Sequence, residues 1–278
     1  LADRRPEARA TMEADFLAAL SGGRVLDAEA ARPEDLADRT AVFLRNPVNG
    51  GYSAGNNIGA RLAAELGCEA VLIINPDVRI DNPDYVAVLT KLVTADPRTA
   101  VTCSALRSLS GAHENPMSEP GFFEELLWPV RMITARLWRA PAGPQPPTAT
   151  SQVDKVSGAC FMIRSDFLRL IGFFDTSVFL YCEESILRAQ VRALGWHMMM
   201  EPGLEALHAH RSSAKGSPLA RFRFWAQSRR QFHRDHGGYG PLRRALLTGS
   251  RALMTGLAGG LYVLRHHLGS MSGRGGGR

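Results

Sequence analysis

A short apolar segment that ends in a carboxylate constrains this chain more than any other feature. The run Ala70–Ile74, with sequence AVLII, is followed directly by Asn75-Pro76-Asp77. Five apolar residues bounded by turn-forming residues predict a buried strand. Open α/β sheets bind their ligands beyond the carboxyl ends of such strands, which makes Asp77 a candidate ligand-binding residue. The alternative is a strand-ending turn with no further role, which Asn-Pro-Asp would also suit.

Strand and helix patterns alternate along the first half of the chain. Apolar runs predict strands at 40–44, 70–74 and 100–105, and apolar residues at period four predict a helix at 58–66. This alternation predicts an α/β fold with a doubly wound, Rossmann-like and mostly parallel sheet flanked by helices. We expect one large domain over residues 1–213 and a basic helical extension over residues 214–278.

The charge of the chain is divided unevenly between these two regions. From Ala206 to the end there are 13 Lys and Arg residues against one acid, Asp235, whereas residues 1–205 carry a net charge of −6. A basic tail predicts an anionic partner. Its apolar stretch at 252–264 is too short and glycine-rich for a membrane span but suits an interfacial segment. We therefore expect an anionic membrane surface as the partner rather than nucleic acid.

The aromatic and basic residues at 221–230 add a more specific expectation for the tail. Arg221, Arg223, Arg229 and Arg230 alternate there with aromatic side chains and would suit phosphate or lipid headgroups, or else a solvated helix face. The four cysteines, at 68, 103, 160 and 182, lie far apart without zinc-binding spacing. Together with the lack of a recognisable signal peptide, they predict a cytoplasmic protein, peripheral at the inner face of the cell membrane.

A second acidic site follows about a hundred residues after Asp77. Glu183 and Glu184 open an amphipathic helical pattern, and His208 comes shortly afterwards. One strand-end Asp, a carboxylate pair and a His suit a metal-held diphosphate and a general base. Glu184 could instead form a surface ion pair with Arg188, four residues later on the same helix, without any catalytic role. By chemistry alone, His210 is as good a candidate as His208.

Two groups of segments together resemble family 2 of the inverting glycosyltransferases, which has a GT-A fold, and especially its rhamnosyltransferase-like branch. The first group is the Gly- and Asn-rich run 49–59 followed by Ile74–Val78. The second group comprises 156–164, 172–175, 179–184, Gly195 and His208. The order and spacing of these segments are similar to that family over residues 24–213.

The resemblance implies transfer of a hexosyl or rhamnosyl group from a nucleoside-diphosphate sugar to a saccharide or lipid-linked acceptor, an EC 2.4 activity. It implies that Mg²⁺ or Mn²⁺ is held by Asp77 and His208, and that Glu184 is the general base with Glu183 beside it. The implied donor-binding residues are Asp27, Gly51, Asn56, Asn57 and Asp77. For Asn56 and Asn57 we also expect that one of them caps a helix that starts at Ile58.

Two departures from the family's pattern support a competing hypothesis. The family's first strand, which ends in Thr-Tyr-Asn or similar, has no counterpart before Leu1, and we expect it to be missing. The acidic motif reads Glu183-Glu184-Ser185-Ile186, without the usual third acid. These differences would also suit a degenerate sugar-nucleotide-binding or membrane-scaffold protein. A nucleotidyltransferase is disfavoured, because no Gly-rich loop with Lys or Arg lies near the start.

Overall fold

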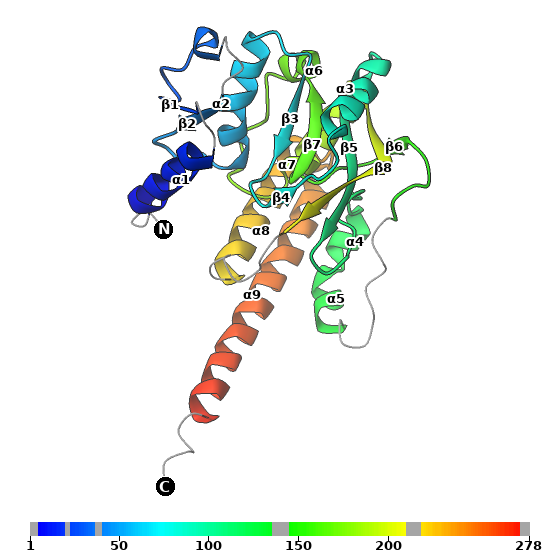
Figure 1. Ribbon diagram of the computed structural model, residues 1–278. Helices are drawn as coiled ribbons and strands as arrows, with labels where there is room; N and C mark the ends of the chain where they lie inside the picture. Colours follow the sequence, from blue (N-terminus) through cyan, green and yellow to red (C-terminus); the bar gives the residue numbers. More distant parts are fainter. Residues whose placement is uncertain (1–4, 20–22, 37–40, 135–144, 210–217, 273–278) are drawn as a thin grey trace.

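The computed structural model describes residues 5–19, 23–36, 41–134, 145–209 and 218–272 of the 278-residue chain (Figure 1). In this described part, the larger sheet has six strands in the order β3-β7-β5-β8-β4, with β6 paired to β8. A smaller sheet contains β1 and β2. The predicted domain boundary at residues 213–214 lies outside the described residues, so it stays a prediction.

The larger sheet is built on strands whose residues are mostly apolar. Its strands are β3 (Ala70–Ile74), β4 (Val78–Arg79), β5 (Thr99–Ser108), β6 (Ser151–Val153), β7 (Cys160–Arg164) and β8 (His197–His208). The first eight residues of β5 are all buried, as expected for a strand covered on both faces. The predicted strand that ends just before Asn75 is β3.

The expectation of a mostly parallel sheet is corrected by the strand pairing. Only β5 and β8 pair in parallel among the described strands of the larger sheet, whereas β7 runs antiparallel to both β3 and β5. The β4–β8 and β6–β8 pairs are also antiparallel. An apolar run shows that a strand is buried but carries no information on its direction, and β7 enters the sheet only after the long insert that follows β5. As a result Ile74, the last residue of β3, pairs with Cys160, the first residue of β7.

Helices cover both faces of the larger sheet, which confirms the predicted α/β class. Helix α3 (Tyr85–Ala95) packs on one face with Met162 and Cys160 of β7. Phe161 and Ile163 of β7 point to the opposite core, which includes residues of α2 (Tyr52–Glu65), α6 (Ser165–Leu170) and α7 (Glu183–Ala193). The alternation along β7 is the period of two expected when each face of a strand meets its own helices.

The smaller sheet lies beside α2 and carries the amino-terminal helix. Strands β1 (Arg24–Asp27) and β2 (Val42–Arg45) pair in parallel, with the short 3-10 helix η1 (Pro33–Leu36) between them. Helix α1 (Arg5–Ala19) packs on β2, since the Phe16 and Phe43 rings lie 5.7 Å apart and Arg45 Nε bonds Glu13 at 2.8 Å.

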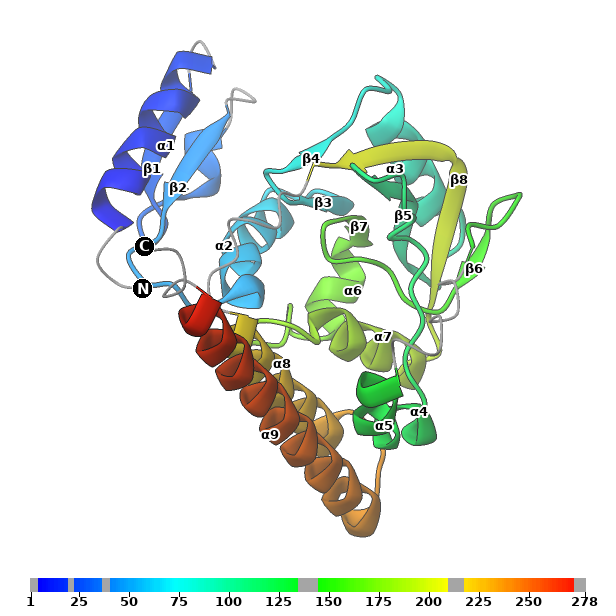
Figure 2. The same ribbon diagram turned by 90° about the horizontal axis from the view of Figure 1, so that it is seen from below.

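Four helices form the end of the molecule below the larger sheet in Figure 1. They are α4 (Phe122–Leu126), α5 (Trp128–Thr134), α8 (Pro218–Asp235) and α9 (Pro241–Ser272). Figures 1 and 2 both show α8 beside α9, which also contacts α4 and α5. In the described part of the chain, no helix is both long enough and apolar enough to cross a membrane.

Candidate functional site

The carboxylates of Glu183 and Glu184 stand at the amino-terminal end of α7. The two residues before the helix, Tyr181 and Cys182, both have φ of 71°, in the left-handed region that non-glycine residues rarely adopt. Backbone strain of this kind is concentrated at functional sites. The positive end of the helix dipole favours negative charge at this position.

Glu184 is held by the backbone of a segment that precedes β7. Its Oε1 accepts a hydrogen bond from the Gly158 N–H at 3.3 Å, and the Gly158 carbonyl accepts one from the Tyr52 hydroxyl at 2.5 Å. A Cβ at position 158 would lie only 3.0 Å from Glu184 Oε1, so glycine allows this close approach without displacing the carboxylate. The alternative pairing of Glu184 with Arg188 does not form, because Arg188 bonds Asp154 at 2.8 Å.

Glu183 has the electrostatic environment of a proton acceptor. Its Oε1 is buried without a hydrogen-bond partner among the described residues. Burial, together with the charge of Glu184, raises the pKa of Glu183 to about 7. A carboxylate with a pKa near the working pH is well suited to general-base chemistry. Burial of the Tyr52 side chain, together with the charges of Glu184 and Glu183, raises the pKa of the Tyr52 hydroxyl. Tyr52 therefore stays a neutral hydrogen-bond donor.

Asp77 and His208 lie together at the far end of β3 and β8. The Asp77 Oδ1 and His208 Nε2 atoms are 3.2 Å apart, and the Ala209 N–H donates to the Asp77 carbonyl at 2.7 Å. This contact follows from the pairing of Val78 with His208 between β4 and β8. The other imidazole nitrogen, Nδ1, is 2.6 Å from Glu114 Oε2. His210, the other candidate histidine, lies outside the described residues.

Glu114 is a site residue that the sequence did not reveal. It lies in the insert after β5, and its backbone N–H donates to the Leu106 carbonyl at 2.8 Å. No motif or characteristic spacing around Glu114 indicates a functional role. Its only distinguishing feature in the sequence is that it is an acid in the insert that follows a buried strand. Its contact with His208 therefore depends on how the insert folds back over β5.

One backbone segment connects the two acidic groups. Ser157 N–H donates to Asn115 Oδ1 at 2.7 Å, next to Glu114. Gly158 contacts Glu184, and the Ala159 carbonyl accepts a hydrogen bond from Asn75 N–H at 2.8 Å, two residues before Asp77. The segment 157–159 therefore has Asp77 and His208 near one part and Glu184 near another. Both acidic groups belong to the edge where β3 ends and β7 begins.

The glycine-rich loop helps to shape this edge through close backbone contacts. Gly51 has φ of 96°, and a Cβ there would lie 2.2 Å from the Phe179 carbonyl oxygen. The next residue, Tyr52, donates its N–H to the same oxygen at 3.1 Å. Glycine is thus required both for its dihedral angle and for the space it leaves.

Asn56 and Asn57 do not cap a helix, which corrects that expectation. Helix α2 begins at Tyr52 rather than Ile58, because the glycine-rich run is itself helical, so both residues lie inside it. Asn56 donates its amide to the Tyr52 carbonyl at 3.1 Å. Asn57 is buried and bonds both backbone groups of Phe174, at 2.8 and 2.9 Å. These two hydrogen bonds fix the 172–175 turn against α2.

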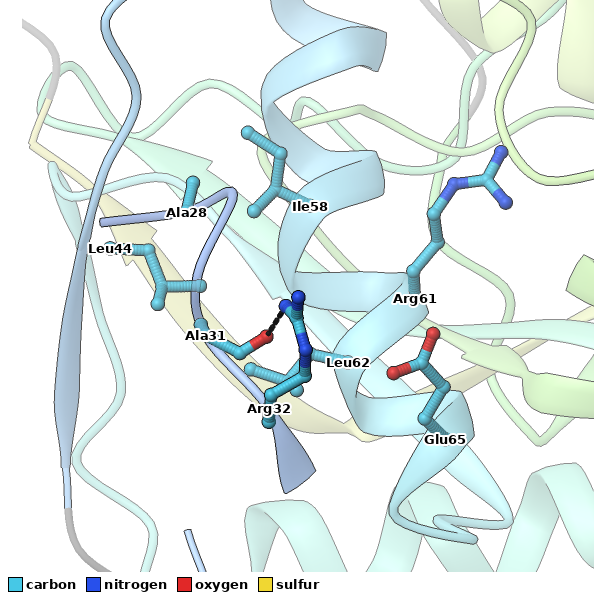
Figure 3. Close-up of a pocket in the computed structure, with 8 residues that line it drawn as sticks. All are labelled: Ala28, Ala31, Arg32, Leu44, Ile58, Arg61, Leu62 and Glu65. Carbon is cyan, nitrogen blue, oxygen red and sulfur yellow. Dashed lines mark hydrogen bonds between the residues drawn. The ribbon is translucent and has the colours of Figure 1, made fainter. Parts of the chain in front are cut away.

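Asp27 lies apart from these groups, at the end of β1 in the smaller sheet. Its carboxylate is largely exposed and 3.9 Å from Arg45 Nη1. A cavity of about 250 Å³ begins at the next residue. Figure 3 shows α2 side chains on one side of this cavity and the loop after β1 on the other. The cavity is lined by Ala28, Ala31, Arg32, Leu44, Ile58, Arg61, Leu62 and Glu65.

A buried group of charged side chains lies behind the start of α7, and we call it the buried charge cluster. Arg229 of α8 bonds Glu119 at 2.6 Å and also pairs with Glu125 of α4. Its side chain is only 4% exposed, so the expectation that Arg229 contacts phosphate or lipid headgroups is wrong. The cluster consists of Glu119, Glu125, Lys155, Ser185, Arg229, His233 and Arg251.

The charge balance within this cluster keeps Glu119 ionised. Burial acts to raise the pKa of Glu119, but the charges of Arg229 and Lys155 outweigh it and hold that pKa below its ordinary value. Burial lowers the pKa of His233, which is neutral near pH 7. No sequence pattern indicates this cluster, because its members come from five separate segments.

Comparison with known proteins finds sequence similarity to two sugar transferases. No family model matches it. It is 31% identical over 141 residues to the low-salt glycan biosynthesis hexosyltransferase Agl10 of Haloferax volcanii, covering 49% of this chain and 41% of that protein. It is 27% identical over 198 residues to N-acetylglucosaminyl-diphospho-decaprenol L-rhamnosyltransferase of Mycobacterium tuberculosis, covering 67% and 62%. The chain thus matches less than two thirds of the length of either relative.

These relatives confirm the resemblance seen in the motifs, including its rhamnosyltransferase-like character. Among solved structures, GalNAc-T7 with UDP, GalNAc and Mn²⁺ superimposes with a TM-score of 0.46 and 15% identity, over 79% of this chain and 46% of that one. The mannosyltransferase PcManGT from Pyrobaculum calidifontis gives 0.42 and 16%, over 79% and 54%. Scores this low leave the interpretation to the sequence relatives and to the site itself.

Proposed function

We propose that this chain is the donor-binding and transfer region of an inverting glycosyltransferase that uses a nucleoside-diphosphate sugar. The observation that carries the proposal is the segment 157–159, whose backbone contacts Glu184, Asn75 two residues before Asp77, and Asn115 next to Glu114. An acidic pair on a strained turn, beside a second acidic group at a sheet edge, suits displacement at a sugar carbon. The similarity to a hexosyltransferase and an L-rhamnosyltransferase supports the same reaction class.

The residues around His208 fit the divalent cation that the resemblance implies. Asp77 is 39% exposed on its side chain, so its carboxylate is accessible, and Glu114 adds a second carboxylate 2.6 Å from the imidazole. No group of three or more ligands is arranged to hold an ion among the described residues. Mg²⁺ and Mn²⁺ are commonly bound by one or two carboxylates with phosphate oxygens completing the shell. Asp77 and His208 would hold such an ion, which would neutralise charge on the leaving diphosphate.

The acidic pair supplies the base in this proposal. The acceptor hydroxyl must lose a proton as it attacks, and Glu184 is the proposed acceptor of that proton, with Glu183 as the alternative. Gly158 fixes the Glu184 carboxylate, and Glu183, with a pKa of about 7, is partly deprotonated near neutral pH. One displacement without a covalent intermediate would invert the anomeric configuration.

The acceptor in this proposal is a saccharide or a lipid-linked saccharide. The relative from Mycobacterium tuberculosis is named for a diphospho-decaprenol acceptor. A cytoplasmic chain at the inner face of the membrane would meet such an acceptor through its basic tail. The roles of Asp27, Gly51, Asn56 and Asn57 in donor binding belong to the same proposal, with Asn57 acting through the turn that it clamps.

One observation favours a second candidate, a sugar-nucleotide-binding protein without transfer. Ile186 occupies the place where the family carries a third acid, and it is 2% exposed in an apolar cluster with Val178, Cys182 and Phe232. A buried isoleucine cannot replace a carboxylate that contacts substrate. In this candidate Asp77 would still bind the diphosphate.

A transfer assay with Glu184→Gln separates these two candidates. We expect the variant to bind the donor as the wild type does but to lose sugar transfer, because the amide keeps the shape and cannot accept a proton. Full transfer by Glu184→Gln together with loss by Glu183→Gln would assign the base to Glu183. No transfer by a full-length wild-type protein across donors and acceptors, with donor binding intact, would establish the second candidate.

A further inference from the structure

An exposed apolar row runs along α4 and α5. Phe123, Leu127, Val130 and Ile133 are 72%, 51%, 54% and 67% exposed. The two helices form a nearly continuous segment, because Leu127 N–H donates to the Phe123 carbonyl and Arg131 N–H donates to the Leu127 carbonyl. Residues separated by four, three and three positions lie on one face of such a helix. We call these four side chains the α4–α5 row.

The opposite side of the same segment is fixed firmly to the protein. Glu125 is 1% exposed within the buried charge cluster, and its carbonyl accepts a hydrogen bond from Ser250 of α9 at 3.2 Å. The Trp128 ring lies 5.0 Å from Trp225 of α8. The row is therefore held facing outward by its own packing. Soluble monomers rarely expose contiguous apolar surface of this kind without an interaction partner.

The beginning of α9 adds a second apolar face at the same end of the molecule (Figures 1 and 2). Leu242, Leu246 and Leu253 are 74%, 45% and 57% exposed, at spacings of four and seven that place them on one helix face. Arg243 lies beside Leu242, and its guanidinium carbon is 5.3 Å from the Phe122 ring of α4. The helices that carry the two apolar faces are therefore in contact with each other.

Basic residues on the same helices select the kind of partner. Arg131, Arg230, Arg234 and Arg243 are exposed on α5, α8 and α9, and two of them are paired, Arg131 with Glu124 and Arg234 with Asp235. The sequence from Ala206 onward has a net charge of +12, although its Arg229 and Arg251 are buried. Apolar side chains flanked by arginines fit an interfacial helix that binds anionic lipid. A second copy of this chain would bring the same positive charge against it, and nucleic acid would leave the apolar row exposed to water.

We propose that this helical end docks on an anionic bilayer, with the α4–α5 row inserted at the boundary between headgroups and acyl chains. This inference does not depend on the transfer chemistry, but it gives the proposed function its orientation. Glu125 on the buried side of the row pairs with Arg229, and Arg229 bonds Ser185, the residue after Glu184. The lipid-facing helix and the proposed base are thus connected through two side chains.

Flotation of the full chain with lipid vesicles tests this inference. We expect binding to phosphatidylcholine vesicles that contain phosphatidylglycerol, weaker binding at high salt, and little binding to phosphatidylcholine alone. The double variant Leu127→Ser/Ile133→Ser should reduce binding at least about tenfold, because two large apolar side chains no longer leave water. Arg243→Gln/Arg244→Gln should weaken binding and flatten its salt dependence.

A matched control uses apolar residues that are equally exposed elsewhere. Leu109 and Leu170 are 58% and 56% exposed on the loop after β5 and on α6, so Leu109→Ser/Leu170→Ser should bind vesicles as the wild type does. Donor binding by calorimetry, unchanged in every variant, shows that each remains folded and keeps this test separate from the proposed function. Equal vesicle binding by the Leu127/Ile133 variant and the control would overturn the inference. So would a wild-type dimer in sedimentation that the Leu127/Ile133 variant dissociates, which would identify the row as a contact between copies.

Discussion

Arg229 of α8 donates a hydrogen bond to Ser185 of α7 at 3.2 Å, 44 residues earlier in the chain. Ser185 also donates to Glu119, at 2.6 Å, which Arg229 binds as well. The residue next to Glu184 is therefore held by a helix from the basic extension. Helix α8 forms part of the wall behind the proposed base, although the sequence suggested a separable appendage.

The first prediction concerns the stability that Arg229 provides. Arg229→Met should lower the free energy of unfolding by about 3–5 kcal/mol, because it removes the buried cation that Glu119 and Glu125 share. The neighbouring Arg230 is exposed and offers a matched control, for which Arg230→Met should stay within about 0.5 kcal/mol of wild type. Urea denaturation monitored by circular dichroism measures both. Equal losses for the two variants would show that the buried charge cluster adds no stability of its own.

The second prediction concerns Glu183 and pH. A carboxyl whose pKa is raised in the folded state, here to about 7, destabilises the fold once the pH exceeds its unfolded value near 4.5. Glu183→Gln should therefore increase the free energy of unfolding at about pH 8, by on the order of 1–3 kcal/mol, and this gain should vanish near pH 4. Denaturant unfolding at the two pH values measures the difference.

An exposed acid provides the control for this pH effect. Glu69 is exposed at the turn before β3, so Glu69→Gln should show no comparable gain at either pH. A gain for Glu183→Gln that persists at about pH 4 would come from packing or amide hydrogen bonding, and it would refute the raised pKa as its cause.

The third prediction concerns the cation at Asp77. Calorimetry with UDP and dTDP should show binding that needs Mg²⁺ or Mn²⁺ and that Asp77→Ala weakens at least about tenfold, or about 1.4 kcal/mol. Asp81 is an exposed carboxylate nearby that pairs with Arg79, and Asp81→Ala should bind as wild type does. Wild-type affinity that is unchanged in EDTA would exclude a metal role for Asp77 and His208.

Local patterns in the sequence were sufficient to predict β3, the strand-end Asp77 and the acidic start of α7. They could not predict that β7 runs antiparallel to its neighbours. The direction of a strand depends on how the chain returns to the sheet and on which strands it pairs with, and neither is visible in a local pattern. Glu114 reaches His208 only after the insert folds back, so no short spacing reveals it. Arg229 was read as a surface cation for a similar reason, since its two carboxylate partners lie more than a hundred residues away in sequence.

The last prediction tests the contact between Gly158 and Glu184. Gly158→Ala would place a methyl group 3.0 Å from Glu184 Oε1 and 3.2 Å from the Tyr52 hydroxyl, so the carboxylate must move. A displacement of about 1 Å in a catalytic group can cost about a hundredfold in rate, and the shift needed here is smaller, so kcat should fall by up to about tenfold while donor binding changes little. Gly59 in α2 offers the matched control, because nothing lies within 4 Å of a Cβ built there. Gly59→Ala should keep full activity and stabilise α2 by about 0.5–1 kcal/mol. If Gly158→Ala transferred sugar at the wild-type rate, the position of Glu184 against this backbone would be irrelevant to the reaction, and Glu183 would become the residue to test.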